Sequence, residues 1–375
     1  MEVRVGGTVH SGFIDASVTL TMDALANDFQ LTYSDRWVES GEPLPIEAGD
    51  AVQILIDGEV VLDGYADHPE IDVQADKKAL TVSGRSKAGD LVDCAVIHPS
   101  GTWRNQTVGQ IASEVCEPFG ILVTVFDDIV RIPRVSLEDG EGAEALIMRL
   151  ARMRGLVVFS IGGDLVMSRA GAERTKTPLW RGANIIGGKR SSDHSQRFSE
   201  YHFHGQTRGS DTVTGQNSTQ LHHKVDDTEM RRYRPMLVVA GGAGGSDDLG
   251  VRAILERNQR LGRSERIVVD VDSWFDDDLL WTPNKLVEVH DYELRVDADL
   301  IVSTVRYQHS PTSEGKGNSV SLEMTYPQAY SAERDVPLRP RGRRRGQIVE
   351  RIFPAPFTPL IPGDFRPLVP ATEDP

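Results

Sequence analysis

Four histidines that lie close together in the chain are the residues best suited to metal chemistry. His202 and His204 occupy alternate positions of an expected strand, and His222 and His223 follow. Two strand histidines with a third ligand could bind zinc, which accepts imidazole nitrogen. No cysteine or HExxH spacing accompanies them, and isolated matches of this kind are weak. We therefore interpret the histidines as a surface or interface group and expect no metal site.

Two further runs have the composition of ligand loops without the spacing. Gly241–Ser246 precedes an expected helix, as phosphate-binding loops do. No lysine follows it, and Asp247 and Asp248 would repel a phosphate. We interpret the run as a flexible loop in which Ser246 or Asp247 caps the helix. The run Asp276–Asp278 lacks the spacing of a calcium loop and predicts a solvated turn.

No arrangement typical of nucleophilic or acid–base catalysis stands out. The chain has no G-x-S-x-G sequence, and none of its many carboxylates is marked as a glycosidase pair. Two cysteines give no disulfide framework. Cys116 lies on the apolar face of an expected helix and Cys94 follows an apolar pair, so we expect two buried thiols. The sequence predicts no enzyme, no cofactor and no metal.

Composition limits the class of protein further. A chain of 375 residues with 39% hydrophobic content has room for two to four domains. No apolar run approaches the roughly 20 residues that span a bilayer, and the N-terminus lacks the apolar core of a signal peptide. We therefore expect neither membrane insertion nor export by that route. The formal net charge of −15 argues against general nucleic-acid binding, which uses basic surfaces.

Short alternating strands dominate residues 1–97. The expected strands are Val18–Met22, Phe29–Tyr33, Val52–Ile56, Val60–Tyr65, Ile71–Ala75 and Ala79–Ser83. Asp57-Gly58 suits a type I′ hairpin turn, and Ser86 is the expected cap of a short helix through Val92. Strands that follow one another without helical crossovers indicate an antiparallel barrel or sandwich.

The pattern changes to α+β over residues 98–180. Thr107 and Gln110 form a capping box for a helix that Pro118 and Gly120 end. The other expected elements are a helix over 142–154 with Leu146, Ile147, Leu150 and Met153 on its packed side and Gly155 as its stop, and strands over 121–125, 156–161 and 164–168. Together they predict a compact layer of helices on a sheet.

The β pattern returns over residues 181–326, interrupted by one helix near 247–261. The expected strands include Tyr201–His204, Ile267–Asp272, Lys285–Val289, Leu300–Tyr307 and Val320–Thr325. In both β regions a turn, at 48–50 or 282–284, leads into a strand that two more strands follow. Chance similarity of short strands is the alternative. We interpret the chain as an α+β, mainly β protein with two related antiparallel β-barrel (tube-type) domains, at 1–97 and 181–326.

Residues 327–375 predict an extended, proline-rich tail without a core of its own. The segment is either a flexible tail or an arm that lies along a partner, with prolines limiting the entropy lost on ordering. For an arm, a basic cluster and scattered aromatic residues supply the contacts. The residues expected to bind the partner are Arg343, Arg344, Arg345, Phe353 and Phe357.

The stretch Val60–Val96 also resembles a known family. The order of DGYADH and LTVSGRSKAGDLVDC within Asp63–Cys94 is similar to the hub proteins of Mu-like contractile phage baseplates. The resemblance covers the chain from Met1 to about Tyr326 and is clear again over Arg263–Tyr307. These motifs are not catalytic, so their specificity depends on their length and order.

The resemblance implies a homotrimeric structural protein of the virion tail baseplate, assembled in the host cytoplasm. Two barrels in each of three chains would form a ring of six, which can join the sixfold tail tube to the threefold membrane-piercing spike. The ring would also contact other baseplate proteins and let DNA pass without binding it specifically. An acidic channel wall would then repel DNA, although solubility explains the negative charge more simply.

Three other functions remain open from the sequence. The hub core of a bacterial contractile injection or secretion system shares this fold and symmetry. Such cores often continue into a covalent spike, and the lack of a β-helix repeat here favours a separate spike protein. A virion enzyme that cuts peptidoglycan is the alternative from another class. A carbohydrate binder is disfavoured by the aromatic content of 6%.

Overall fold

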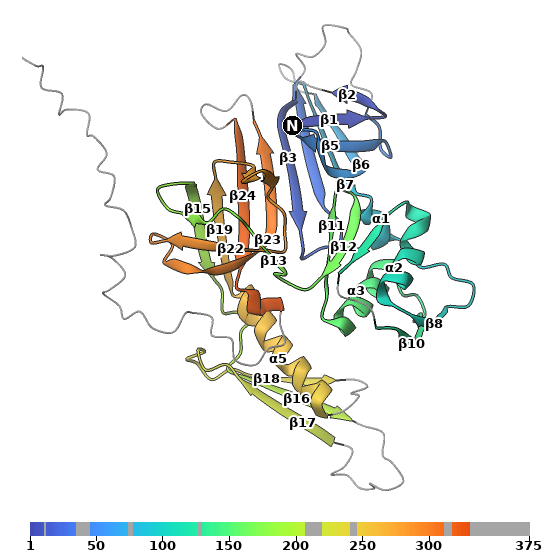
Figure 1. Cartoon of the computed structure of the whole chain (residues 1–375), viewed down its shortest axis with the longest axis vertical. Helices are drawn as coiled ribbons and strands as arrows, with labels where there is room; N and C mark the ends of the chain where they lie inside the picture. The colour runs from blue at the N-terminus through green and yellow to red at the C-terminus, as the bar shows by residue number, and fades with distance from the viewer. Residues whose placement is uncertain are drawn as a thin grey trace, which may run out of the picture. The chain divides into compact units, whose positions relative to one another are not determined.

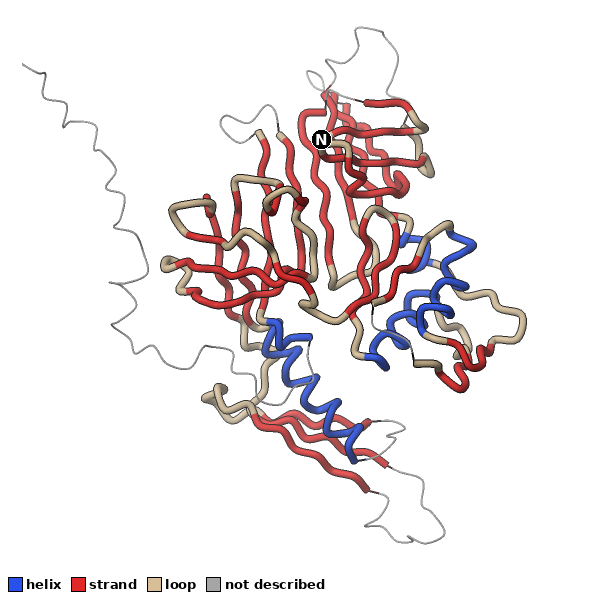
Figure 2. Tube along the Cα trace, in the orientation of Figure 1, coloured by secondary structure: helices blue, strands red, loops and turns tan. Residues whose placement is uncertain are grey.

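The computed structural model describes residues 1–10, 13–34, 46–73, 78–126, 130–206, 220–240, 246–310 and 317–330. Within these ranges the fold is mainly β, with several sheets and few helices (Figures 1 and 2). None of the helices in these ranges is long and apolar enough to cross a membrane.

The N-terminal strands form one antiparallel sheet. They are β1 (Glu2–Val5), β2 (Thr8–His10), β3 (Phe13–Thr21), β4 (Asp28–Ser34), β5 (Ala51–Ile56), β6 (Glu59–Val73) and β7 (Lys78–Ser86). The alternation seen in the sequence buries one face, which includes Val18, Leu20 and Leu31. Asp57 and Gly58, at the β5–β6 turn, have φ of 51° and 83°, which confirms the predicted left-handed turn.

Strand β6 is longer than the sequence pattern indicates. One strand continues through a bulge between Ala66 and His68, where two separate strands were expected. The predicted helix cap at Ser86 is wrong, because helix α1 (Ala88–Asp93) has no side-chain cap. The buried Ser86 hydroxyl instead accepts a hydrogen bond from the backbone N–H of Asn27. A contact between strands therefore takes the place of the local cap.

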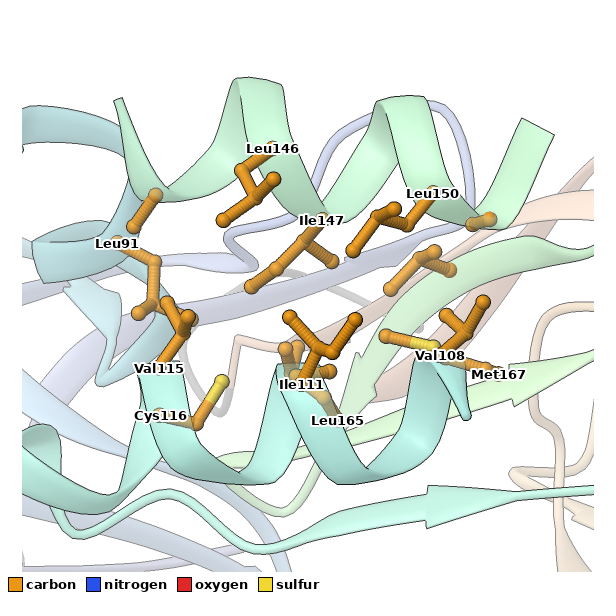
Figure 3. Packing of buried hydrophobic residues seen from close by; sticks show 14 of the residues in the cluster. Leu91, Val108, Ile111, Val115, Cys116, Leu146, Ile147, Leu150, Leu165 and Met167 are labelled. Carbon is orange, nitrogen blue, oxygen red and sulfur yellow. The ribbon is translucent and has the colours of Figure 1, made fainter. Parts of the chain in front are cut away.

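A layer of helices and short strands follows. Its elements are β8 (Thr102–Gln106), α2 (Val108–Cys116), the 3₁₀ turn η2 (Glu117–Phe119), β9 (Val123–Val125), β10 (Ile132–Ser136), α3 (Ala143–Arg154), β11 (Val157–Ile161) and β12 (Asp164–Ser168). The capping box of Thr107 and Gln110 is confirmed, and Gly120 ends the η2 turn in the left-handed region. In Figure 3 the buried side chains of α3 point toward those of α2, with Leu165 and Met167 of β12 beside them.

Two predictions in this part of the chain are wrong. Met153 is exposed, because the packed stripe of α3 runs through Leu146, Leu150 and Ala151 and leaves Met153 to one side. Cys94 is exposed as well, since it is the extended residue that follows α1. The prediction that Cys116 is buried is confirmed.

A second set of β-strands completes the main sheet. Its strands are β13 (Glu173–Arg174), β14 (Leu179–Trp180), β15 (Ile185–Ser192), β19 (Glu265–Val271), β22 (Lys285–Asp291), β23 (Val296–His309) and β24 (Asn318–Thr325), beside a small hairpin of β20 (Phe275–Asp276) and β21 (Leu279–Leu280). The expected solvated turn at this hairpin is correct for the exposed Asp277 and Asp278 only. Asp276 is buried, and its carboxylate accepts hydrogen bonds from the backbone N–H groups of Lys176 and Thr177.

The two β sets have the same strand order. One reads β3-β4-β7-β6-β5 and the other β15-β19-β24-β23-β22. They are joined because β3 pairs with β23, with Val18 opposite Tyr307. The result is a single 14-stranded sheet whose main path ends at β15 and β2. The sequence predicted two barrels, whereas the described strands form one open path that runs through both sets.

A separate three-stranded sheet lies between β15 and β19 in the sequence. It consists of β16 (Glu200–Gln206), β17 (Gln220–Asp226) and β18 (Pro235–Ala240), in the order β17-β16-β18. Helix α5 (Ser246–Arg263) packs on one face of this sheet and lies along it in Figure 1. The 3₁₀ turn η3 (Pro327–Tyr330) packs against α5, where a Cβ on Gly262 would meet Ala329 at 2.0 Å.

Candidate interaction surfaces

The residues that the sequence singled out for partner binding lie outside the described residues. These are Arg343, Arg344, Arg345, Phe353 and Phe357. The predicted tail begins at residue 327, but its first four residues form the η3 turn on α5 and belong to the folded part. Residues 241–245 of the predicted glycine-rich loop are likewise not described.

One face of the β16–β18 sheet has no cover among the described residues. Alternation sends Tyr201 and Phe203 under α5, and sends His202 and His204 to the opposite face. On the neighbouring strand β18, Leu237 and Val239 share that open face and are 66% and 76% exposed. An exposed sheet face with aliphatic residues is typical of an interaction surface.

His222 joins the two strand histidines on this face. Its ring lies 4.7 Å from that of His204, between ring centres, and its Nε2 lies 3.3 Å from Nδ1 of His202. Nε2 of His202 contacts the Glu200 carboxylate at 3.0 Å. Partial burial and the nearby His204 and His202 lower the pKa of His222. His223 points the other way, because a Cβ on Gly250 of α5 would approach its ring at 3.2 Å.

The predicted surface group is therefore a stack of three histidines rather than four. Among the described residues, no group of three or more histidine, cysteine, aspartate or glutamate side chains is placed to hold a metal ion. The exposed face therefore combines imidazole rings with the aliphatic side chains of Leu237 and Val239.

A buried ion pair holds the segment that enters this sheet. Arg197 and Asp227 side chains are 3% and 2% exposed and are joined at 2.6 Å and 3.0 Å. The guanidinium groups of Arg234 and Arg260 each lie over the ring of Phe198, with their central carbon atoms 5.2 Å from the ring centre. Cation–π contacts of this kind add to the ion pair. These directional contacts hold Arg197 and Phe198 against Asp227, Arg234 and Arg260.

Among the described strands, the main sheet also has edges without a partner strand. β15 lies at one end of the strand path, and β6 continues past its partner β5, whose pairing ends at Tyr65. The remainder of β6 carries Ile71 and Val73, which are 63% and 67% exposed. This exposure was not predicted from the sequence, because the alternation of Ile71 and Val73 with acidic residues is typical of a half-buried strand.

Comparison with known proteins identifies the class of protein to which this chain belongs. Models of phage tail and baseplate domains match four parts of it: the Mu phage baseplate assembly protein GpP-like N-terminal domain (residues 1–86), the baseplate hub protein gp44-like second domain (88–169), the tail protein NMB1110-like third domain (197–254) and the GpP fourth domain (249–333). The chain is a structural protein of a phage tail baseplate.

A curated relative narrows this class to one family. The chain is 30% identical over 317 residues to the baseplate hub protein gp44 of Escherichia phage Mu, which covers 81% of this chain and 83% of the relative. The chain belongs to the family of Mu-like baseplate hub proteins, and the resemblance noted in the sequence is confirmed.

Solved structures share the fold. The 43 kDa tail protein of prophage MuSo2 from Shewanella oneidensis matches with a TM-score of 0.77 at 30% identity, covering 88% of this chain and 98% of that one. A tail protein from Neisseria meningitidis MC58 matches with a TM-score of 0.73 at 23% identity and the same coverage. A type VI secretion system component from Escherichia coli has a TM-score of 0.55 at 10% identity, with 90% and 80% covered. The last two comparisons concern the fold alone.

Proposed function

We propose that this baseplate hub protein acts as a homotrimeric adaptor between a sixfold tail tube and a threefold membrane-piercing spike. The trimer forms part of the channel through which DNA leaves, without binding DNA specifically. It contacts the tube protein, the spike protein and other baseplate proteins. Its role is mechanical, and it carries no catalytic site.

The strand order of the main sheet is the observation that carries this proposal. One chain contains two five-stranded sets with the same order, joined edge to edge through β3 and β23. Three copies of a chain with two similar units present six similar units, which matches a sixfold partner while keeping threefold symmetry for another. A chain with a single set would not reconcile the two symmetries in this way.

The domain organisation of the proposal follows the same logic. The two sets correspond to barrel domains at residues 1–97 and 181–326, with the α+β domain at 98–180 beside them. The part of the predicted tail that follows η3, residues 331–375, supplies an arm to a partner through Arg343, Arg344, Arg345, Phe353 and Phe357. In this arrangement the open strand path closes only when copies assemble.

Among the alternatives, the phage assignment is favoured over a secretion system. The Mu hub protein and the Shewanella prophage tail protein are each 30% identical to this chain, against 10% for the secretion system component. The peptidoglycan-cutting alternative predicts clearing of cell wall in a zymogram with purified protein, and clearing would contradict a purely structural role.

Light scattering and electron microscopy of the purified chain test the proposal. We expect a mass of three chains and a ring with threefold symmetry and six lobes. Samples with added tube and spike proteins belong in the same experiment, because assembly can require a partner. A chain that stays monomeric at high concentration, alone and with both partners, would contradict the proposed trimer.

A further inference from the structure

The two strand sets can be aligned residue by residue through their bulges. β6 has a bulge immediately before His68, where it pairs with β7, and β23 has one immediately before Thr304, where it pairs with β24. His68–Val73 and Thr304–His309 therefore occupy the same place in the two sets. The alignment makes Ile71 the counterpart of Tyr307.

One of these two stretches has partners on both sides and the other does not. Thr304–His309 pairs with β24 on one side and with Ala16–Thr21 of β3 on the other. His68–Val73 pairs with β7 alone among the described strands. This stretch of β6 is the counterpart of the β23 edge that pairs with β3, but no described strand pairs with it.

Strand β15 is the counterpart of β3. Both pair with the equivalent strand of their set, β4 or β19, and both have a bulge near the start, after Phe13 and after Ile185. Gly188–Asp193 then matches Ala16–Thr21. On this side of β15 the described residues contribute one isolated bridge, from Arg181 to Ile185, which lies before the matching stretch.

Burial shows what the unmatched stretch of β6 lacks. Tyr307 is completely buried where it faces Val18 across the β3–β23 junction. Its counterpart Ile71 is 63% exposed, and the next residue on the same face, Val73, is 67% exposed. Tyr307 is enclosed within its own set as well, because its ring packs against Trp274 and its hydroxyl donates a hydrogen bond to the Trp281 carbonyl oxygen. A second strand beside β6 would bring side chains against Ile71 and Val73, as β3 brings Val18 against Tyr307.

The two open stretches offer one pair of opposite charges at facing positions. β6 has Glu70 and Asp72, and β15 has Lys189, whereas Arg190 already pairs with Glu265 at 2.9 Å and Asp193 lies at the end of its stretch. The alignment places Asp72 opposite Lys189, and Ile71 opposite Arg190, whose methylene stem can lie over the isoleucine. Opposite charges on facing positions favour this register over a register shifted by one residue, which would also move Ile71 to the wrong face.

We propose that His68–Val73 of one copy pairs antiparallel with Gly188–Asp193 of the next copy, as β23 pairs with β3 within the chain. The proposal rests on the proposed trimer and names the contact that holds it together. Each copy offers one edge of each kind, so the interface is head-to-tail and a threefold rotation closes the ring with both of these edges paired. β2 remains the other end of the strand path.

Pro69 determines which backbone groups bond across this interface. Proline has no N–H, so it occupies a position whose backbone groups point away from the paired strand, here β7. The backbone N–H and C=O groups of Ile71 and Val73 then both point to the open edge. Pro69 contributes only its carbonyl oxygen there. Asp72 and Lys189 form a narrow pair with Cα atoms about 4.5 Å apart, which is within reach of a disulfide.

Disulfide trapping tests the register. Asp72→Cys and Lys189→Cys are combined in a chain in which the exposed Cys94 is replaced by serine. We expect oxidation to link three chains covalently, seen as a trimer band on a non-reducing gel that reduction removes. The matched control combines Asp72→Cys with Ser192→Cys, which lies three residues out of register and on the other face.

The outcomes separate this inference from the proposed function. If light scattering shows a trimer but the Asp72–Lys189 pair does not crosslink, or crosslinks no better than the control pair, the strand pairing is wrong and the trimer stands. If the chain is monomeric with and without its partners, both fail.

A second variant tests the apolar contact without a disulfide. Ile71→Lys should raise the concentration at which the trimer half-dissociates by about tenfold or more, because one aliphatic side chain loses its burial. Ile97→Lys is the control, since Ile97 is exposed but lies on neither strand. Equal dissociation of the two variants, with circular dichroism spectra like that of the parent, would overturn the proposal.

Discussion

The guanidinium of Arg197 and the carboxylate of Asp227 form a two-point ion pair that is almost completely buried. Glu229 adds a third contact to the same guanidinium at 3.1 Å. Removal of the Asp227 charge would leave the buried guanidinium with only the half-exposed carboxylate of Glu229, which costs far more than the net contribution of the intact pair.

Breaking this pair should therefore destabilise the protein strongly. We expect Asp227→Asn to lower the free energy of unfolding by about 3–5 kcal/mol in urea denaturation. The control is Asp299→Asn, which breaks the half-exposed pair of Asp299 with Arg174 and should cost about 1 kcal/mol or less. Similar losses in the two variants would contradict a buried pair.

The two thiols should differ in reactivity. Cys94 is exposed, whereas burial of Cys116 raises the pKa of its thiol to about 12. Because the thiolate is the reactive form, one thiol per chain should react with an aromatic disulfide reagent at neutral pH, and two in denaturant. Cys94→Ser should abolish the reaction of the folded protein, and a fast residual reaction would contradict the burial of Cys116.

The capping box of α2 gives a local stability test. The Thr107 side chain accepts a hydrogen bond from the backbone N–H of Gln110. The Gln110 side chain in turn accepts a hydrogen bond from the backbone N–H of Thr107. Thr107→Ala should lower the free energy of unfolding by about 0.5–2 kcal/mol. Ser113→Ala, on the exposed face of the same helix, should leave it unchanged or raise it slightly. Loss of stability in Ser113→Ala alone would reverse this interpretation.

The histidine stack predicts a pH dependence of known sign. The pKa of His222 is lowered from its ordinary value of 6.5, mainly by partial burial and then by His204 and His202. The unfolded chain then binds the proton more readily, so the stability contributed by neutral His222 is present above pH 6.5 and falls as the pH drops below it.

Nuclear magnetic resonance titration of the imidazole protons measures this directly. His222 should titrate below 6.5, and His204→Gln should raise its pKa toward that value by removing a neighbouring positive charge. The control is Val239→Ala, which alters the same face without changing its charge and should leave the pKa of His222 nearly unchanged. An unchanged pKa in His204→Gln would show that the two rings do not interact.

The sequence predicts which face of its strand each candidate surface residue occupies, but not which of these residues meet. Alternation alone predicts that His202 and His204 face away from Tyr201 and Phe203. It does not predict that His222 joins them while His223 lies beneath α5, because that depends on the register of β16 with β17 and on where the helix packs. The exposure of Cys94 and the role of Ser86 likewise depend on neighbours that are distant in the sequence.

The sequence by itself determined the faces of the strands, the left-handed turn at Asp57 and Gly58, and the two ends of α2. These features arise from backbone preferences and side-chain spacing over a few residues. Only the tertiary structure decided that the two β sets share one sheet, since Thr21 and Thr304 meet across 283 positions of chain. Such a contact depends on which edges remain unpaired once each set has folded, and no local pattern records it.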